Sequence, residues 1–391
     1  MKRVICGLEK LQFEQASIVA KRRIGLVSHP AAINSNLTHS LEILKNTGAK
    51  IEILFGPEHG FGGEAQDMEL IEGSTQSFKG IPLYSLYGAS KETLSPPENL
   101  VRGLDALVID LTDVGSRYYT FIWTTILCLR VCHAAGVELI VLDRPNPLGG
   151  LQVEGAPQQP GFLSFVGLLP IPNRHGLTNG EIARMVARDE GLEDALTIVT
   201  MDGWERWMYF EDTRLPWVLP SPNMPTVDTA VVYPGMCLLE GTWASEGRGT
   251  TRPFEIFGAP KVNSLKLVRY LNTLKLPGVS FRPTSFKPTF QKHAHLSCKG
   301  AQLHITDRHL FKPYLTGVAV LSALKHVAAD TFAWRLAPYE FVSDIPAIDL
   351  LTGSDVVRLA IESGASLAEL SKTWSKGQKD WIEQSKDLHI Y

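Results

Sequence analysis

The sequence predicts an α/β protein with a Rossmann-like, mostly parallel sheet in a larger domain and a second, smaller α+β domain. The first observation is that short apolar runs alternate with helical patterns between residues 23 and 201, which is typical of a parallel sheet covered by helices. The second is that these runs end in polar residues, as strands do at a ligand-binding edge. The third is a change of pattern after Ala259-Pro260. We therefore expect domains at residues 1–260 and 261–391.

The expected strands are short runs rich in branched apolar residues, and they cover residues 23–29, 51–55, 81–86, 106–111, 137–142 and 196–201. The expected helices among them cover residues 40–46, 121–135 and 178–190, and the last begins with a capping box formed by Thr178 and Glu181. A further helix should end near Glu240 and lead into a glycine-rich loop. In the smaller domain we expect helices at 262–276, 314–328 and 355–363 and strands at 279–283 and 302–306.

Composition excludes several classes of partner. A formal charge of −3 suggests neither nucleic acid nor an anionic membrane surface, and no run approaches the ~18 apolar residues of a membrane helix. The five cysteines show no zinc spacing, and their odd number favours a reducing compartment. No strand leads into a dinucleotide-binding or Walker motif, so we expect no cofactor. As the chain stands we expect a cytoplasmic location, or a periplasmic or secreted one if a leader was removed.

The stretch from Lys50 to Gly63 contains the strongest candidate for catalysis. Its strand stops at Gly56-Pro57 and places Glu58 and His59 on a glycine-rich loop. A carboxyl and an imidazole held by a rigid strand are well placed for proton transfer. The alternative is that Glu58 caps a turn and His59 makes a local hydrogen bond.

Carboxylates beside arginine, asparagine, tyrosine and tryptophan recur on the loops, and this mixture suits a carbohydrate. Glycoside hydrolysis requires a carboxyl acid on one side of the bond and a carboxylate on the other. The candidates for these two groups are Glu58, Asp110, Asp113, Glu240 and Glu246.

Two other functions compete with a glycosidase. The first is a metal-dependent hydrolase, whose metal ligands would come from His29, Glu58, His59, Asp110, Asp113 and His175. No spacing typical of a metalloprotease supports this function, so we expect no metal. The second is a non-catalytic sugar- or muropeptide-binding protein, which would use the same aromatic and polar side chains.

Six motifs, in this order, resemble the bacterial exo-β-N-acetylmuramidase family, formerly a domain-of-unknown-function family. They are Phe-Gly-Pro-Glu-His-Gly-Phe (55–61), Asp-Leu-Thr-Asp-Val-Gly-Ser-Arg-Tyr-Tyr-Thr (110–120), Leu-Asp-Arg-Pro-Asn-Pro-Leu-Gly-Gly (142–150), Leu-Pro-Ser-Pro-Asn-Met-Pro-Thr (219–226), Tyr-Pro-Gly-Met-Cys-Leu-Leu-Glu-Gly-Thr (233–242) and Ser-Glu-Gly-Arg-Gly-Thr-Thr-Arg-Pro-Phe-Glu (245–255). The resemblance covers nearly the whole chain.

The resemblance implies release of terminal N-acetylmuramic acid from the non-reducing end of peptidoglycan fragments, in cell-wall turnover and recycling. It implies a site in the cleft between the two domains, where Glu58 matches the family's catalytic glutamate. The second catalytic carboxylate stays open, with Asp113 and Glu246 as the main candidates, and so do the stereochemical outcome and the oligomeric state.

The remaining candidates would bind substrate: His59, Asp110, Arg117, Tyr118, Arg144, Asn146, Asn223, Glu240 and Arg248. N-Acetylmuramic acid carries a lactyl carboxylate, for which the planar guanidinium of arginine is well suited. Among the arginines we favour Arg248, because Gly247 and Gly249 allow its backbone to approach a ligand. The alternative is that Arg248 pairs with Glu246 and only shapes the loop.

Overall fold

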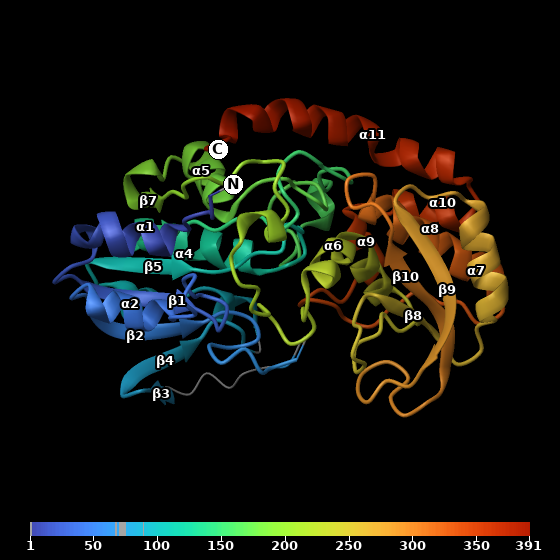
Figure 1. The fold of residues 1–391 in the computed structure, drawn as a ribbon, viewed down its shortest axis with the longest axis horizontal. Helices are drawn as coiled ribbons and strands as arrows, with labels where there is room; N and C mark the ends of the chain where they lie inside the picture. The colour runs from blue at the N-terminus through green and yellow to red at the C-terminus, as the bar shows by residue number, and fades with distance from the viewer. Residues whose placement is uncertain (1, 67–68, 70–75, 89) are drawn as a thin grey trace.

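The computed structural model describes residues 2–66, 69, 76–88 and 90–391. It contains a seven-stranded sheet with helices on both faces and a smaller, three-stranded antiparallel sheet with its own helices (Figure 1). The predicted fold class is therefore confirmed. The boundary expected near residue 260 stays a prediction. Residues 227–259 are described below with the smaller domain, because the strand at residues 256–259 belongs to the smaller sheet.

The larger sheet is parallel apart from one edge strand, and its order is β3-β4-β2-β1-β5-β6-β7. Its strands are β1 (Arg23–Ser28), β2 (Lys50–Gly56), β3 (Gln76–Phe78), β4 (Ile81–Ser85), β5 (Ala106–Asp110), β6 (Glu138–Leu142) and β7 (Leu196–Val199). Only β3 runs antiparallel to its neighbour among the described residues. The carboxyl ends of β1, β2, β5, β6 and β7 therefore meet at one edge.

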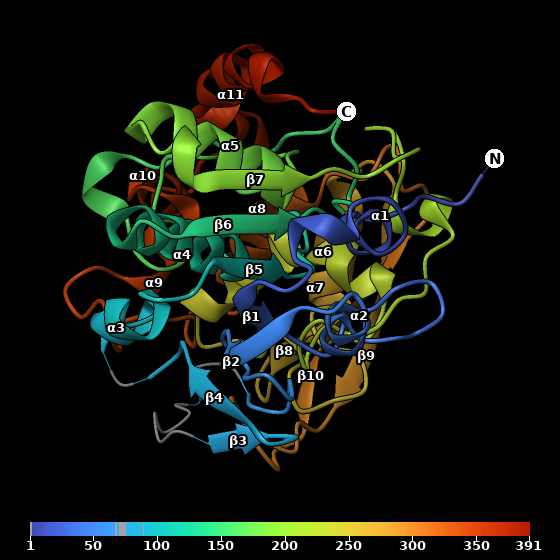
Figure 2. The same cartoon turned by 90° about the vertical axis from the view of Figure 1, so that its left-hand side faces the viewer.

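Helices cover both faces of this sheet (Figure 2). On one face lie α1 (Gly7–Glu14) and α2 (Ser40–Asn46), and on the other α3 (Glu98–Val101), α4 (Phe121–Ala135) and α5 (Asn179–Glu190). Successive side chains of a strand point to opposite faces, so Val108 of β5 packs into the core under α1 and α2 while Leu107 packs into the core under α4. Burial on both faces explains the continuous apolar runs in the sequence.

The smaller sheet has the order β8-β10-β9. Its strands are β8 (Ile256–Ala259), β9 (Val279–Phe286) and β10 (Cys298–Ile305), and the helices of this region are α6 (Val227–Met236), a 3₁₀ helix η6 (Cys237–Gly241), α7 (Ser264–Thr273), α8 (Pro313–Val327), α9 (Ala347–Thr352) and α10 (Val356–Glu362). The sequence did not predict α1, α9, β3 or β8. No helix among the described residues is long and apolar enough to cross a bilayer.

A long C-terminal helix, α11 (Leu367–Gln384), spans the two domains (Figure 1). Near its middle the Trp374 ring packs edge-on against Tyr314 of α8, with centroids 5.1 Å apart. Further along, Trp381 Nε1 donates to the carbonyl of His175, and after the helix the Tyr391 hydroxyl donates to Asp143 Oδ2 at 2.8 Å. The helix, which the sequence analysis also missed, therefore ties the smaller domain to the larger sheet.

Close packing of α6 against α8 positions η6, which carries Glu240. The two helices touch at Gly235 and Gly317, where a Cβ built on Gly317 would lie 2.1 Å from the Gly235 carbonyl oxygen. That distance is far shorter than a van der Waals contact, and the closely packed backbone atoms cannot shift easily to make room for a methyl group.

We therefore expect Gly317→Ala to lower the free energy of unfolding by ~1–3 kcal/mol, because the added methyl group overpacks the helix contact. Urea denaturation measures this change. Gly161→Ala is the control, since a Cβ at Gly161 meets no atom within 4 Å. A Gly317→Ala midpoint equal to that of the control would contradict the close contact.

Candidate active site

A narrow cavity lies between the loops at the carboxyl edge of the large sheet and the loops of the smaller domain. The candidate residues that line it are Glu58, His59, Tyr118, Asn223, Glu240 and Arg248. All of them are buried, and they come from segments far apart in the chain.

Glu58 follows β2 directly and is 5% exposed. The loop folds back tightly on the strand, since a Cβ at Gly56 would lie 2.6 Å from the backbone nitrogen of Phe61. Thr120, just before α4, donates its hydroxyl hydrogen to Glu58 Oε2 at 2.5 Å. The carboxyl is thus held in a fixed orientation from the neighbouring loop.

His59 adopts a left-handed backbone conformation, with φ +70°. Its Nδ1 lies 2.9 Å from the carbonyl oxygen of Ala65, so Nδ1 carries the proton and Nε2 is an acceptor. Burial lowers the pKa of His59, although the charge of Glu58 opposes that shift. His59 therefore makes the local hydrogen bond that was the alternative to a role in proton transfer. This bond holds a neutral imidazole in place beside Glu58.

On the opposite domain, Arg248 joins two carboxylates. Its Nη2 donates to Glu240 Oε1 at 2.5 Å, and its Nε lies 3.4 Å from Glu246 Oε1. Tyr339 donates to the other oxygen of Glu240 at 2.7 Å, and Lys292 pairs with Glu246 Oε2 at 2.9 Å. The pairing of Arg248 with Glu246, which was the alternative to a role in binding, is therefore present. Arg248 also lines the cavity.

Two further lining residues hold neighbouring segments together. The Tyr118 hydroxyl donates to the carbonyl of Pro234 in α6, and burial raises the pKa of Tyr118 well above its ordinary value. Asn223 donates to Gln66 Oε1 at 2.8 Å.

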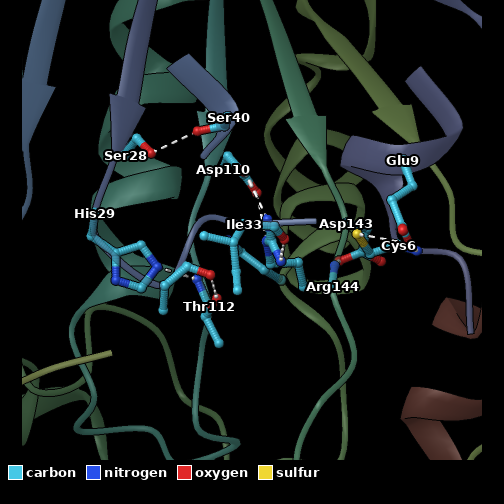
Figure 3. A network of polar contacts seen from close by, with 12 residues as sticks. Cys6, Glu9, Ser28, His29, Ile33, Ser40, Asp110, Thr112, Asp143 and Arg144 are labelled. Carbon is cyan, nitrogen blue, oxygen red and sulfur yellow. Dashed lines mark hydrogen bonds and ion pairs between the residues drawn. The ribbon is translucent and has the colours of Figure 1, made fainter. Parts of the chain in front are cut away.

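Asp110 and Arg144 do not line this cavity, because they pair with each other beneath the carboxyl edge of the sheet (Figure 3). Arg144 donates from Nε and Nη2 to the two oxygens of Asp110 at 2.6 and 2.9 Å and from Nη1 to the Ile33 carbonyl. Burial alone would lower the pKa of Arg144, but the Asp110 carboxylate raises it overall. The pair is architectural in this geometry.

His29 lies in the same network (Figure 3). Its Nε2 accepts from the backbone N–H of Thr112 at 2.9 Å, and its Nδ1 faces the carbonyl of Pro220 at 3.3 Å. Burial lowers the pKa of His29 to about 3, with a further contribution from Arg144. A neutral His29 therefore ties two site loops to β1.

The other candidates also have partners away from the cavity lining. Asp113 accepts from the Gly115 backbone at 2.7 Å and lies 3.4 Å from His175 Nε2. Arg117 donates to the carbonyls of Ile171, Leu350 and Leu351, and burial lowers its pKa to about 10.

Asn146 donates to the Leu177 carbonyl and accepts from the Leu148 backbone. Glu246 is held by Arg248 and Lys292, as described above, and is 1% exposed. None of the four residues Asp113, Arg117, Asn146 and Glu246 lines the cavity.

Sequence reasoning did not single out several polar residues that do line the cavity: Tyr119, Thr120, Ser221, Tyr233, Tyr339 and Glu340. The first four lie within motifs that carry the family resemblance, which is the signal that points to them. Tyr339 and Glu340 lie in a segment without apolar periodicity, and no motif marks them.

Within the described part of the chain, no group of three or more His, Cys, Asp or Glu side chains is arranged to hold a metal ion. Of the six residues that might have formed such a site, Asp113 and His175 lie 3.4 Å apart, whereas His29 bonds to the Thr112 backbone and Asp110 pairs with Arg144.

The cavity lies at the carboxyl edge of a parallel sheet, where ligands bind in such folds, and the carboxyl groups of Glu58, Glu240 and Glu340 line it. Glycoside hydrolysis uses a pair of such groups. The fold and the site place this chain among two-domain α/β glycosidases.

Two family models match consecutive parts of the chain. The N-terminal model of the exo-β-N-acetylmuramidase NamZ matches residues 24–228, and the C-terminal model of the same family matches residues 231–391. The chain is also 41% identical over 390 residues to the peptidoglycan β-N-acetylmuramidase NamZ of Bacillus subtilis, covering 100% of this chain and 92% of that protein. The chain belongs to the NamZ exo-β-N-acetylmuramidase family and is a glycosidase.

Solved structures agree with this assignment. A crystal structure of a DUF1343 family protein from Bacteroides fragilis superposes with a TM-score of 0.89 at 31% identity, and the match covers 100% of this chain and 99% of that one. A second DUF1343 protein from the same organism gives a TM-score of 0.76 at 28% identity with the same coverage.

The carboxylates around Arg248 predict a pH-dependent stability. Burial raises the pKa of Glu240, but the charge of Arg248 and the hydrogen bonds from Arg248 and Tyr339 outweigh it, so the net pKa is below the ordinary 4.5. A carboxyl with a lowered pKa contributes stability above its unfolded-state pKa and loses it as the pH falls through its folded-state pKa.

We expect Arg248→Met to lower the free energy of unfolding by ~3–5 kcal/mol at neutral pH, since it leaves buried charge uncompensated. The difference from the wild type should shrink as the pH falls below about 4.5. Denaturant unfolding at a series of pH values measures both. In the control Arg252→Met, a half-exposed ion pair with Glu255 is lost, which should cost under ~1 kcal/mol. A loss at Arg248 that is equal at pH 7 and pH 3 would contradict the electrostatic explanation.

Proposed function

We propose that this enzyme releases terminal N-acetylmuramic acid from the non-reducing end of disaccharide or muropeptide fragments of peptidoglycan, with Glu58 as the general acid. The observation that carries this proposal is the position of Glu58, a buried carboxyl at the end of β2 in a cavity lined by both domains. The curated relative from Bacillus subtilis is named a peptidoglycan β-N-acetylmuramidase, which supports this substrate class.

In the proposed reaction Glu58 gives its proton to the glycosidic oxygen while the bond from that oxygen to C1 breaks. Thr120 holds Oε2 of the carboxyl and so limits its rotation. Positive charge develops on C1 and the ring oxygen, and carboxylates around the cavity stabilise it. The neutral imidazole of His59 contributes a hydrogen-bond acceptor next to Glu58.

The enclosure of the site supports action at a chain end. Glu58 and Arg248 are each 5% exposed although they line the cavity, so the site is a pocket rather than an open groove along which a glycan could lie. The free space between the lining side chains is about 20 Å³, smaller than a sugar ring, so the loops around the pocket must move apart when a terminal sugar binds.

Glu58→Gln keeps the shape of the side chain and removes the titrating proton. We expect it to lower kcat roughly 10²–10⁴-fold on the unactivated disaccharide N-acetylmuramyl-N-acetylglucosamine. The loss should be much smaller on a 4-nitrophenyl glycoside, because nitrophenolate leaves without protonation. Both rates are measured by product release under saturating substrate.

Glu52→Gln is the matched control, since Glu52 is an exposed residue of the same strand. Near-wild-type turnover of the disaccharide by Glu58→Gln would rule out Glu58 as the general acid. No hydrolysis by the wild type would instead favour a sugar-binding protein.

We also propose that Arg248 contributes to recognition of the lactyl carboxylate. Among the described residues it is the cation that lines the cavity, and its guanidinium lies over the Phe254 ring at 5.0 Å. Its pairing with Glu240 and Glu246 orients the guanidinium within the cavity wall.

Arg248→Lys retains the positive charge that the two carboxylates need and removes the planar fork. We expect it to lower kcat/KM for the N-acetylmuramic acid glycoside by about tenfold or more, the equivalent of losing a charged hydrogen bond. The corresponding N-acetylglucosamine glycoside, which lacks the lactyl group, should lose much less. Equal losses on the two substrates would assign Arg248 a purely structural role.

A further inference from the structure

We propose that Glu340, which the smaller domain contributes, is the second carboxylate of the glycosidase reaction. The inference rests on the proposed function, in which Glu58 is the general acid, and it names the partner that this reaction needs. Neither composition nor a motif marks this residue, and only the folded chain brings it to the cavity.

Three glutamates among the described residues line the cavity: Glu58, Glu240 and Glu340. Glu240 is bound at both carboxylate oxygens, by Arg248 at 2.5 Å and by Tyr339 at 2.7 Å, so both of its oxygens are held within the Arg248 network. Asp113 and Glu246, the candidates drawn from the sequence, lie outside the cavity lining. Glu340 lines the cavity and comes from the smaller domain, whereas the general acid Glu58 comes from the larger domain.

The backbone around Glu340 shows that the position is costly to form. Tyr339 and Val342 exchange two backbone hydrogen bonds of 2.9 and 3.0 Å, which closes a two-residue turn. Its central residues, Glu340 and Phe341, both have positive φ, +46° and +64°. A turn of this type strongly prefers Asn-Gly, because side chains other than those of Gly, Asn and Asp are strained in the left-handed region.

Strain of this kind persists only where the surrounding structure enforces it, and it is concentrated at functional sites. Here the effect of the turn is to place Glu340, 3% exposed, at the cavity wall beside Tyr339. An unstrained Asn-Gly turn would close the same loop without a carboxyl group at this point.

The carboxyl group of Glu340 is also oriented from the larger domain. The buried hydroxyl of Tyr87 donates toward both oxygens, at 3.2 Å to Oε2 and 3.4 Å to Oε1. The Tyr87 ring packs against Phe341 of the same turn, with centroids 5.9 Å apart. The Tyr87 hydroxyl limits rotation of the Glu340 carboxyl group, as the Thr120 hydroxyl does for Glu58.

The reaction balances with these two residues and one water. Glu58 protonates the glycosidic oxygen, which leaves with the electron pair of its bond to C1. The Glu340 carboxylate either bonds to C1, forming an ester that water then hydrolyses with Glu58 as base, or takes a proton from the water that attacks C1. In the first case the attacking water returns a proton to Glu58. In the second case Glu340 ends protonated and Glu58 ionised, and the proton passes from Glu340 back to Glu58 through solvent. In both cases the hydroxyl of the water ends on C1 and one proton ends on the leaving sugar.

The test uses the 4-nitrophenyl β-glycoside of N-acetylmuramic acid with the full-length enzyme. We expect Glu340→Ala to lower kcat by roughly 10²–10⁴-fold with the melting temperature near that of the wild type. Sodium azide should restore part of the rate, because azide attacks C1 from the face that Glu340 occupied. The product should then be the α-glycosyl azide, identified by nuclear magnetic resonance.

Glu98→Ala, which removes an exposed glutamate of α3, is the control and should retain wild-type turnover. If Glu340→Ala does not fold, Glu340→Gln serves in its place, and the same loss of kcat with KM changed less than a few-fold is the expected result. Activity of the folded variant within tenfold of wild type, or a large loss that azide does not relieve in Glu340→Ala, would overturn the role of Glu340.

These outcomes are distinguishable from failure of the proposed function. If the wild type does not cleave the glycoside, the proposed function itself fails. If the wild type cleaves it and only the Glu340 variants depart from expectation, Glu58 keeps its role and the second carboxylate lies elsewhere.

Discussion

The buried guanidinium of Arg248 is the interaction on which the smaller domain's half of the site depends. It neutralises Glu240 on η6 and Glu246 on its own loop, and through Glu240 it is connected to Tyr339. Removing two carboxylates from water costs several kcal/mol each unless a cation and hydrogen bonds compensate them. This network therefore keeps in place the turn that carries Glu340, whose backbone conformation is unfavourable by itself.

A second buried ion pair shows why polar residues at strand ends are an incomplete guide to a site. Asp110 and Arg144 come from neighbouring strand ends, as Glu58 does, yet they satisfy each other beneath the edge of the sheet. Because each of their charges is matched by the other, a substrate has little to gain from either. What separates them from Glu58 is that they pair with each other outside the cavity that Glu58 lines, and spacing along the chain does not encode this difference.

Left-handed backbone at non-glycine residues recurs around the cavity. His59, Phe254 and Glu340 all line it with φ of +70°, +62° and +46°. Each is held by contacts from another segment: Ala65 accepts from His59, the Arg248 guanidinium lies over Phe254, and Tyr87 donates to Glu340. Backbone strain distributed over several loops is typical of functional sites, where the surrounding contacts enforce it.

The sequence by itself determined the fold class and most strands and helices of the large sheet, because burial on both faces leaves continuous apolar runs that end at turn residues. It also predicted Glu58 as a site residue, because Glu58 follows a strand after Pro57 and lies within a family motif. It missed α11, whose role is to bridge two domains. Only the tertiary structure shows which polar residues share the cavity. Arg248 and Glu340 line it together with Glu58, whereas Arg144 does not. The physical reason is that the partners of a buried charge come from other elements of the fold, as Asp110 and Arg144 or Glu240 and Tyr339 do, and no local pattern records which elements meet.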